Sequence, residues 1–256
     1  MWQCRPGEGF YRQPFDLPST VRDSAGGSIP RAIHQIWIGP NPLPDEFAQY
    51  ARQWEALHPG WSYCLWTNDK LAAEFPEHDP SAWGSTWAAQ SDVWRLLILE
   101  RFGGLYVDTD FEPFRSFESL IAGAAFLASR IGVQGGKDDN IANGLLACEP
   151  GHPLIRAAVA AAMDGTAQGL PILEAAGPAM MTRVLGDVQK AFRKPVFSNG
   201  QEVGSLYGDT GVVVLHEPVC YPYLWHHFRP TSYPPTAWAA HHWARSWWTP
   251  MDWGDS

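Results

Sequence analysis

The sequence predicts an α/β protein in which helices flank a central sheet. Apolar segments of strand length at residues 32–38 and 61–66 enclose a segment with helical periodicity, and this order begins a parallel sheet. Further along, a long helical segment stops at Gly103-Gly104 and leads directly into a short apolar strand. The 256 residues, 45% hydrophobic and 18% charged, suffice for a sizeable core.

The first structured segments follow an irregular lead-in over residues 1–28, which is rich in Pro and Gly and has no sustained period. Residues 32–38 form the apolar run of a buried strand, and a proline-rich loop ends it because proline cannot continue a ladder. The apolar residues of Asp45–Leu57 recur at helical spacing, and His58-Pro59-Gly60 ends this helix. Residues 61–66 form the second strand.

A second helix begins at Ser85, which we expect to be its N-cap, and runs through Phe102. Residues 105–107 form the strand that follows. The remainder alternates weaker strands with helices: strands near 124–128, 143–147, 211–215 and 237–240, and helices near 152–164 and 178–192. Because neither a repeat nor a linker interrupts this pattern, we expect one domain over residues 29–256.

Composition excludes several classes of protein. Lys plus Arg number 18 against 27 Asp plus Glu, and this net charge of −9 disfavours a nucleic-acid partner. The sequence contains no apolar run of membrane-spanning length and does not begin as a signal peptide does, so we expect a soluble protein without a transmembrane segment. The four cysteines are far apart, which favours reduced thiols; they are Cys4, Cys64, Cys148 and Cys220.

A D-x-D triplet, Asp108-Thr109-Asp110, is the main candidate for chemistry. Two carboxylates separated by one residue of a strand point to the same side and can share one hard cation. Chance alone gives about one such triplet in a chain of this composition, so the context decides. Here the triplet ends an apolar strand, and ligands of open α/β sheets bind at the carboxyl ends of strands.

The type of metal suggests the type of substrate. Mg²⁺ and Mn²⁺ are held by one or two carboxylates together with phosphates of the substrate, which points to a nucleoside diphosphate. A divalent cation stabilises the charge that builds up when a diphosphate departs. The triplet therefore predicts glycosyl transfer from a sugar nucleotide with Mn²⁺ or Mg²⁺ as cofactor.

Two other groups of residues have competing interpretations. Asp92 and Arg95 are three residues apart and so share one face of the expected helix. They either form an intrahelical ion pair or bind the hydroxyl groups of the transferred sugar by charge-assisted hydrogen bonds. The histidine doublets 226–227 and 241–242 allow a transition-metal cluster, but adjacent histidines of a strand face opposite ways. Such histidines more commonly lie at the surface or in the core than in a metal site.

At this point the motifs resemble a known family. Three blocks, at residues 29–39, 61–66 and 91–110, occur in the order found in glycosyltransferase family 32, the D-x-D sugar transferases that include the yeast initiating α-1,6-mannosyltransferase. Large clostridial glucosylating toxins share the pattern more distantly. The resemblance covers residues 29–115 well. Looser matches follow at a G-P turn, 176–179, and at an H-x-x-x-S-W segment, 242–247.

The resemblance implies a GT-A fold with a Rossmann-like mixed sheet and a retaining transfer. It implies catalytic roles for Asp92, Arg95, Asp108 and Asp110, and a metal site of Asp108, Asp110 and His242. The residues that it places around the donor are Trp37, Tyr106, Asn140, Asn143, Ser246, Trp247 and Trp248.

The prediction is thus a metal-dependent retaining hexosyltransferase, with a UDP-hexose as first donor and GDP-mannose as second. Its acceptor, the hydroxyl of a polysaccharide, a glycolipid or another molecule, is left open. The alternatives are a nucleotide-sugar or carbohydrate-binding protein with little transferase activity, and a hydrolase of sugar nucleotides. We expect a cytoplasmic location, or a peripheral one at the inner membrane face.

Overall fold

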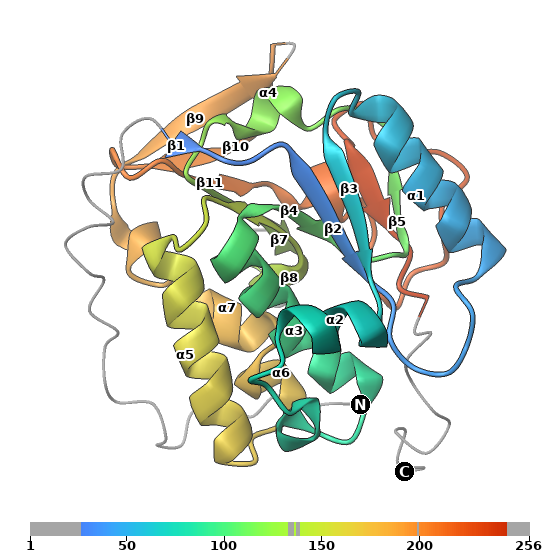
Figure 1. Cartoon of the computed structure of the whole chain (residues 1–256). Coiled ribbons are helices and arrows are strands. Elements are labelled where there is room, and N and C mark those ends of the chain that lie inside the picture. The colour runs from blue at the N-terminus through green and yellow to red at the C-terminus, as the bar shows by residue number, and fades with distance from the viewer. Residues whose placement is uncertain (1–26, 133–135, 137–138, 199, 245–256) are drawn as a thin grey trace.

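A mixed eight-stranded sheet is the centre of the computed structural model, which describes residues 27–132, 136, 139–198 and 200–244 (Figure 1). In spatial order its strands are β3 (Ser62–Trp66), β2 (Ala32–Ile36), β4 (Gly104–Val107), β8 (Asn140–Cys148), β7 (Phe126–Ile131), β11 (Val212–Leu215), β10 (Gln201–Tyr207) and β9 (Arg193–Ser198). Strands β3, β2 and β4 run parallel to one another, whereas β8 runs antiparallel to both of its neighbours. The mixed α/β architecture predicted from the sequence is confirmed.

Helices and short strands cover both faces of this sheet (Figure 1). On one face lie α2 (Asn68–Glu74), the 3₁₀ helix Pro80–Trp83, α3 (Trp87–Phe102), α5 (Pro153–Ala167), α6 (Ile172–Ala175), α7 (Pro178–Val184) and the 3₁₀ helix Val188–Lys190. On the other lie α1 (Asp45–Leu57), α4 (Glu118–Ile121), α8 (Glu217–Cys220) and the pair β5 (Phe111–Pro113) and β12 (Ala239–His241). A two-stranded pair, β1 (Gly27–Ser28) and β6 (Ala122–Gly123), completes the elements.

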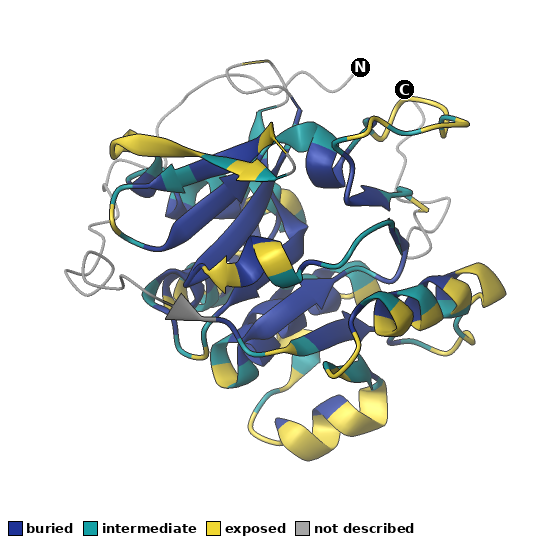
Figure 2. Ribbon diagram, turned by 90° about the horizontal axis from the view of Figure 1, so that it is seen from above, coloured by how far each residue is buried: buried dark blue, intermediate teal, exposed yellow. Residues whose placement is uncertain are grey.

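The sheet separates two apolar cores because successive strand residues point to opposite faces. Tyr106 of β4 packs under α3, while Leu105 and Val107 pack on the side of α1. Figure 2 shows the central strands buried and the exposed surface concentrated on the outer helices and on β9. Burial of this kind removes about 25 cal/mol of unfavourable hydration per Å² of apolar surface.

Several element boundaries differ from those expected. Thr86, not Ser85, caps α3, since its Oγ1 accepts the hydrogen bond of the Ala89 amide at 3.2 Å. The helix expected over 178–192 already ends at Val184, and a separate 3₁₀ turn follows. The hairpin β9–β10 was not predicted, because its outer strand is exposed and lacks the alternation of a half-buried strand.

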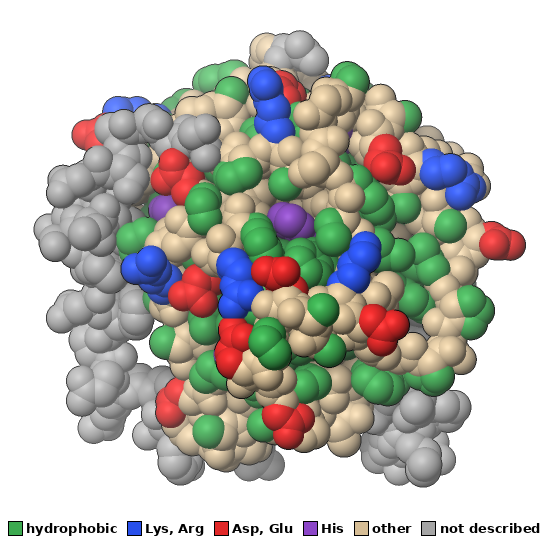
Figure 3. All heavy atoms as spheres, viewed as in Figure 1, with side chains coloured by type: hydrophobic (Ala, Val, Ile, Leu, Met, Phe, Trp, Pro, Cys, Tyr) green, Lys and Arg blue, Asp and Glu red, His purple; other side chains and the backbone are tan. Residues whose placement is uncertain are grey.

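The surface and the thiols agree with the composition. Over the described residues of the face in Figure 3, acidic and basic side chains are interspersed and form no continuous basic stripe. Within the described part of the chain, the helices are too short or too polar to cross a membrane. Cys64, Cys148 and Cys220 are free thiols, and the latter two are buried. Cys4 and the lead-in up to residue 26 lie outside the described residues.

Candidate active site

Two glycines bring Asp108 to the edge of the sheet. Gly103 and Gly104 both have positive φ, 63° and 89°, and join the end of α3 directly to β4. A Cβ at Gly104 would lie 2.7 Å from the carbonyl oxygen of Ala32, so only glycine lets β4 pair with β2 here. Asp108 follows β4 and its amide donates to the carbonyl of Gly144, 2.9 Å away.

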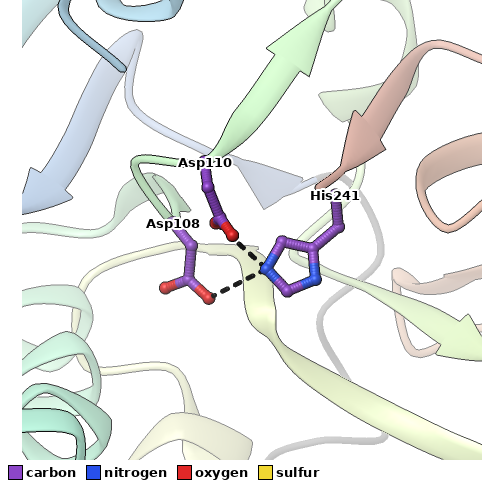
Figure 4. A group of neighbouring side chains, drawn as sticks. All are labelled: Asp108, Asp110 and His241. Carbon is purple, nitrogen blue, oxygen red and sulfur yellow. Dashed lines mark ion pairs between the residues drawn. The ribbon is translucent and has the colours of Figure 1, made fainter. Parts of the chain in front are cut away.

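Asp108, Asp110 and His241 converge at this edge (Figure 4). A turn closed by the Phe111 amide and the Asp108 carbonyl separates the two carboxylates, so a turn and not a strand brings them to one side. His241 arrives because β12 pairs with β5, opposite Phe111. Its Nε2 lies 3.0 Å from Oδ1 of Asp110 and 3.8 Å from Oδ2 of Asp108.

The histidine in this group is His241, whereas the resemblance implied His242. The two residues face opposite ways, as expected for neighbours on an extended segment. His241 stacks on Phe111 with ring centroids 4.6 Å apart. His242 instead contacts Glu112 through Nε2, at 3.0 Å, and the hydroxyl of Tyr223 through Nδ1, at 2.8 Å. The strand pairing, which the sequence does not display, decides between the two.

Arg95 connects α3 to the D-x-D motif. Its Nη2 lies 2.9 Å from Oδ1 of Asp92 and 3.2 Å from Oδ1 of Asp108, and the guanidinium is buried. The intrahelical ion pair is therefore present, and its Arg95 also contacts Asp108 of the D-x-D motif. Tyr106 donates its hydroxyl proton to Oδ1 of Asp108 at 2.7 Å, and Asn143 donates to Oδ1 of Asp92 at 2.9 Å.

The electrostatics of the group favour a cation. Burial raises the pKa of Asp92 to about 6 in spite of Arg95, and burial also raises the pKa of Asp108. Burial opposes ionisation of Asp110 too, but His241 and the amide of Ala244, at 2.9 Å, hold the pKa of Asp110 below its usual range. Arg95 thus pairs with Asp92 and Asp108, whereas His241 pairs with Asp110. Against the effect of burial, the carboxylates of Asp110 and Asp108 raise the pKa of the His241 imidazole. The negative charge of the carboxylates favours a cation among them.

The donor atoms fit a divalent metal. Carboxylate oxygens suit Mg²⁺ and Mn²⁺, and an imidazole nitrogen extends the set toward Mn²⁺ and transition metals. The ligand atoms of Asp108, Asp110 and His241 lie within 4.8 Å of one another. An Asp-Asp-His group that could hold a metal ion is therefore present.

The other residues expected around the donor are Trp37, Asn140 and three residues near the C-terminus. Trp37 follows β2 at the same edge of the sheet, and its indole donates to the carbonyl of Asn41 at 2.8 Å. Asn140 begins β8 and accepts a 3.4 Å hydrogen bond from the hydroxyl of Thr182 on α7. Ser246, Trp247 and Trp248 lie outside the described residues.

Gly144 and Tyr221 surround the same carboxylate and were not predicted. A Cβ at Gly144 would lie 2.6 Å from Oδ2 of Asp108 and 3.2 Å from the hydroxyl of Tyr221. Tyr221 is buried, and its ring packs edge-on against those of Phe111 and His241. The sequence offers no spacing signal for either residue, because Gly144 reaches the site on β8 and Tyr221 at the end of α8, both far from Asp108 along the chain.

Comparison with known proteins finds sequences and one fold similar to this chain. Residues 44–127 match the family described as "Glycosyltransferase sugar-binding region containing DXD motif". Inositol phosphoceramide mannosyltransferase 1 of Schizosaccharomyces pombe is 30% identical over 165 residues, covering 59% of this chain and 50% of that protein. Inositol phosphoceramide mannosyltransferase 3 of the same yeast is 26% identical over 143 residues, covering 53% of this chain and 37% of that protein. The matches thus span half or less of the length of these relatives.

The fold also has a solved counterpart. The structure titled "PaToxG Glycosyltransferase" superposes with a TM-score of 0.51 over 66% of this chain and 74% of that chain, at 18% identity. The expected GT-A fold and the resemblance to D-x-D glycosyltransferases are confirmed. Residues 44–127 thus resemble the sugar-binding region of glycosyltransferases.

Proposed function

We propose that this chain is a metal-dependent retaining glycosyltransferase, which moves a hexose from a nucleoside diphosphate sugar to an acceptor hydroxyl. The observation that carries the proposal is the convergence of Asp108, Asp110 and His241 beside the buried pair of Asp92 and Arg95. The first group is built to bind a cation, and the second presents charged hydrogen-bonding groups next to it.

Asp108, Asp110 and His241 would hold Mn²⁺ or Mg²⁺, and the imidazole favours Mn²⁺. When bound, such an ion neutralises the negative charge that develops on a departing diphosphate. Tyr106 and Arg95 contribute by fixing Oδ1 of Asp108, which leaves Oδ2 directed toward His241. A carboxylate held in this way needs little reorganisation when a ligand arrives.

Asp92, Arg95 and Asn143 form the sugar side of the proposed site. Asn143 donates to Asp92 and Arg95 pairs with it, so the carboxylate is oriented from two sides before substrate enters. Charge-assisted hydrogen bonds from such groups distinguish the hydroxyl pattern of one hexose from that of another. Trp37, at the same edge of the sheet, offers an aromatic face for the nucleotide base.

The names of the relatives favour one donor and one acceptor over the others. Both relatives named above carry mannosyltransferase in their names, which favours mannose, and hence GDP-mannose, over the UDP-hexose that the sequence placed first. Inositol phosphoceramide in the same names favours a glycolipid acceptor. We extend the proposal to residues 29–256 as a single catalytic domain, because the described site residues converge from the central sheet, from α3 and from the β5–β12 pair, which pack on that sheet.

A donor-hydrolysis screen tests the proposal. Purified protein is incubated with Mn²⁺ and, in separate reactions, with UDP- and GDP-sugars, and the nucleotide released is measured. We expect release from GDP-mannose that a chelator abolishes and that Asp110→Asn lowers by roughly a hundredfold or more. Asp209→Asn, at an exposed carboxylate on a distant turn, is the matched control and leaves the rate unchanged.

Two results together would contradict the proposal: no nucleotide is released from any of the sugar nucleotides, and nucleotide binding does not depend on the metal. Binding without turnover, with Asp110→Asn binding as well as the unmodified chain, would indicate a nucleotide-sugar-binding protein instead. Retention is read separately, by determining the anomeric configuration of the released or transferred hexose.

A further inference from the structure

Trp243 has a backbone conformation that favours glycine. Its φ is 53°, and among the described residues it is the one non-glycine residue with a positive φ. In this left-handed region the Cβ of an L residue lies too close to a neighbouring carbonyl oxygen, so a bulky aromatic residue is strained there. Such strain persists where the surrounding contacts determine the conformation, and it concentrates at functional sites. The contacts of Trp243 therefore indicate what the strained turn serves.

The turn at Trp243 brings two backbone amides to Asp110. The amide of His242 donates to the carbonyl oxygen of Asp110 at 3.1 Å, and the amide of Ala244 donates to Oδ2 of the same residue at 2.9 Å. In an extended strand two residues advance the chain by about 7 Å, so the second amide would pass Asp110. The left-handed residue between them lets both amides reach one aspartate.

The indole of Trp243 packs on the imidazole of His241. The centroids of the two rings are 4.3 Å apart, at an interplanar angle of 61°. The indole nitrogen donates to the carbonyl oxygen of Tyr223 at 3.0 Å, which fixes the orientation of the indole. The imidazole also stacks on Phe111 and meets the ring of Tyr221. Three aromatic side chains thus contact the histidine of the site.

Ring packing takes the place of a hydrogen bond on His241. A histidine that binds a metal through one ring nitrogen usually donates from the other to a carboxylate, a backbone carbonyl or water, and this bond fixes the ring. Nδ1 of His241 is buried and has no hydrogen-bond partner in the described part of the chain. Nε2 faces Asp110 and Asp108. The orientation of the imidazole therefore depends on these carboxylates and on the aromatic rings around it, of which that of Trp243 has the nearest centroid.

We propose that Trp243 is a positioning residue of the site. Its indole directs the imidazole of His241 toward the D-x-D carboxylates, and its left-handed backbone brings the next amide to Asp110. The inference rests on the proposed function, because it assumes that Asp108, Asp110 and His241 bind a divalent cation. The indole acts through its neighbours and not as a ligand. Groups that are fixed before a ligand arrives need little reorganisation when it binds.

Titration calorimetry of the full chain with Mn²⁺, without donor, tests the role of the indole. We expect Trp243→Ala to lower the affinity for Mn²⁺ by roughly tenfold, because it removes a group that orients a metal ligand. Trp243→Phe keeps an aromatic ring beside His241 and should remain within about threefold of the unmodified chain. Trp225→Ala, at an indole that is 51% exposed, is the matched control and leaves the affinity unchanged.

Thermal unfolding tests the role of the backbone. Trp243→Gly and Trp243→Ala both lack the indole, and they differ in that glycine adopts a positive φ without strain. The glycine variant should therefore unfold at a temperature about 2–4 °C higher than the alanine variant. At an ordinary extended position the order would be the reverse, because glycine loses more conformational freedom on folding. Packing of the indole alone would not produce the expected order.

Two results would overturn the inference and leave the proposed function intact. They are an affinity of Trp243→Ala for Mn²⁺ equal to that of the unmodified chain, and a Trp243→Gly variant that is less stable than Trp243→Ala. If Trp243→Ala does not fold, Trp243→Leu takes its place, since leucine keeps apolar volume without an aromatic ring, and the same loss of affinity is expected. An unmodified chain that binds no Mn²⁺ would overturn the proposed metal site, and the inference with it.

Discussion

Nε2 of His241 lies 3.0 Å from Oδ1 of Asp110, although the two residues come from distant parts of the sequence. The contact exists because β12 pairs antiparallel with β5, the short strand that follows the D-x-D turn. A strand of three residues thereby completes the group of atoms that could hold a metal ion. The C-terminal part of the described chain thus contributes to this group, even though the D-x-D motif lies near the middle of the sequence.

We predict that His241→Ala weakens Mn²⁺ binding by roughly tenfold or more, because it removes one of three ligand groups. His242→Ala, the neighbouring control, leaves Mn²⁺ affinity within about threefold, because His242 faces Glu112 and Tyr223. Calorimetric titration of each variant with Mn²⁺, without donor, measures the difference. Equal losses in the two variants would contradict the assignment of His241.

Gly144→Ala should impair catalysis without unfolding the protein. Its Cβ would lie 2.6 Å from Oδ2 of Asp108, so the carboxylate must move away from residue 144 and change its position relative to His241. A displacement of about 1 Å at such a group costs on the order of a hundredfold in rate. Gly186→Ala is the control, since its Cβ meets only the carbonyl oxygens of Arg183 and Thr182, at 3.2 and 3.6 Å. Unchanged kcat in Gly144→Ala would show that Oδ2 plays no part.

Arg95→Met should destabilise the fold as well as abolish activity. It leaves the largely buried carboxylates of Asp92 and Asp108, whose side chains are 15% and 23% exposed, near one another without their shared cation. Loss of one partner from a buried ion pair costs about 3–5 kcal/mol of unfolding free energy. Urea unfolding measures this loss, and Asp92→Asn in the Arg95→Met background should restore part of it. Strictly additive losses in the double variant would contradict the coupling.

Stability should fall in mild acid because of His34. Burial lowers the pKa of His34 to about 4, against a hydrogen bond to the carbonyl of Gly103. The Trp66 indole donates to Nδ1 of His34 at 3.2 Å, so the neutral ring is the one that fits. Between about pH 6.5 and 4, His34 binds a proton in the unfolded chain but not in the folded chain. The free energy of unfolding therefore decreases as the pH falls.

The slope approaches about 1.4 kcal/mol per pH unit for this one group within that window, and it vanishes above pH 6.5. Urea unfolding at a series of pH values measures it. His34→Gln keeps a donor and an acceptor without titrating, so its slope should be smaller by that amount. An identical slope in both proteins would assign the acid sensitivity to other groups, such as the buried His152, whose pKa burial lowers to about 4.

Much of the first half of the fold could be predicted from local patterns. Helix α1 occupies the expected residues 45–57, and β2, β3 and β4 lie where apolar runs indicated them. Hydrophobic periodicity and the helix end at Gly103-Gly104 depend on neighbouring residues, so they can be recognised in the sequence alone. The edge hairpin β9–β10 was missed because its exposed strand carries no such signal.

By itself, the sequence displayed the residues on which the proposed chemistry rests: the D-x-D motif after a glycine-bounded strand, and the pair Asp92 and Arg95 on the helix before it. The tertiary structure alone decided which residues complete the site. The choice of His241 over His242 and the position of Gly144 beside Asp108 depend on the pairing of strands that lie far apart in the sequence. The local sequence determines whether a segment prefers a helix, a strand or a turn. The register of paired strands, and the side of the sheet to which each side chain points, are decided only when distant segments pack together.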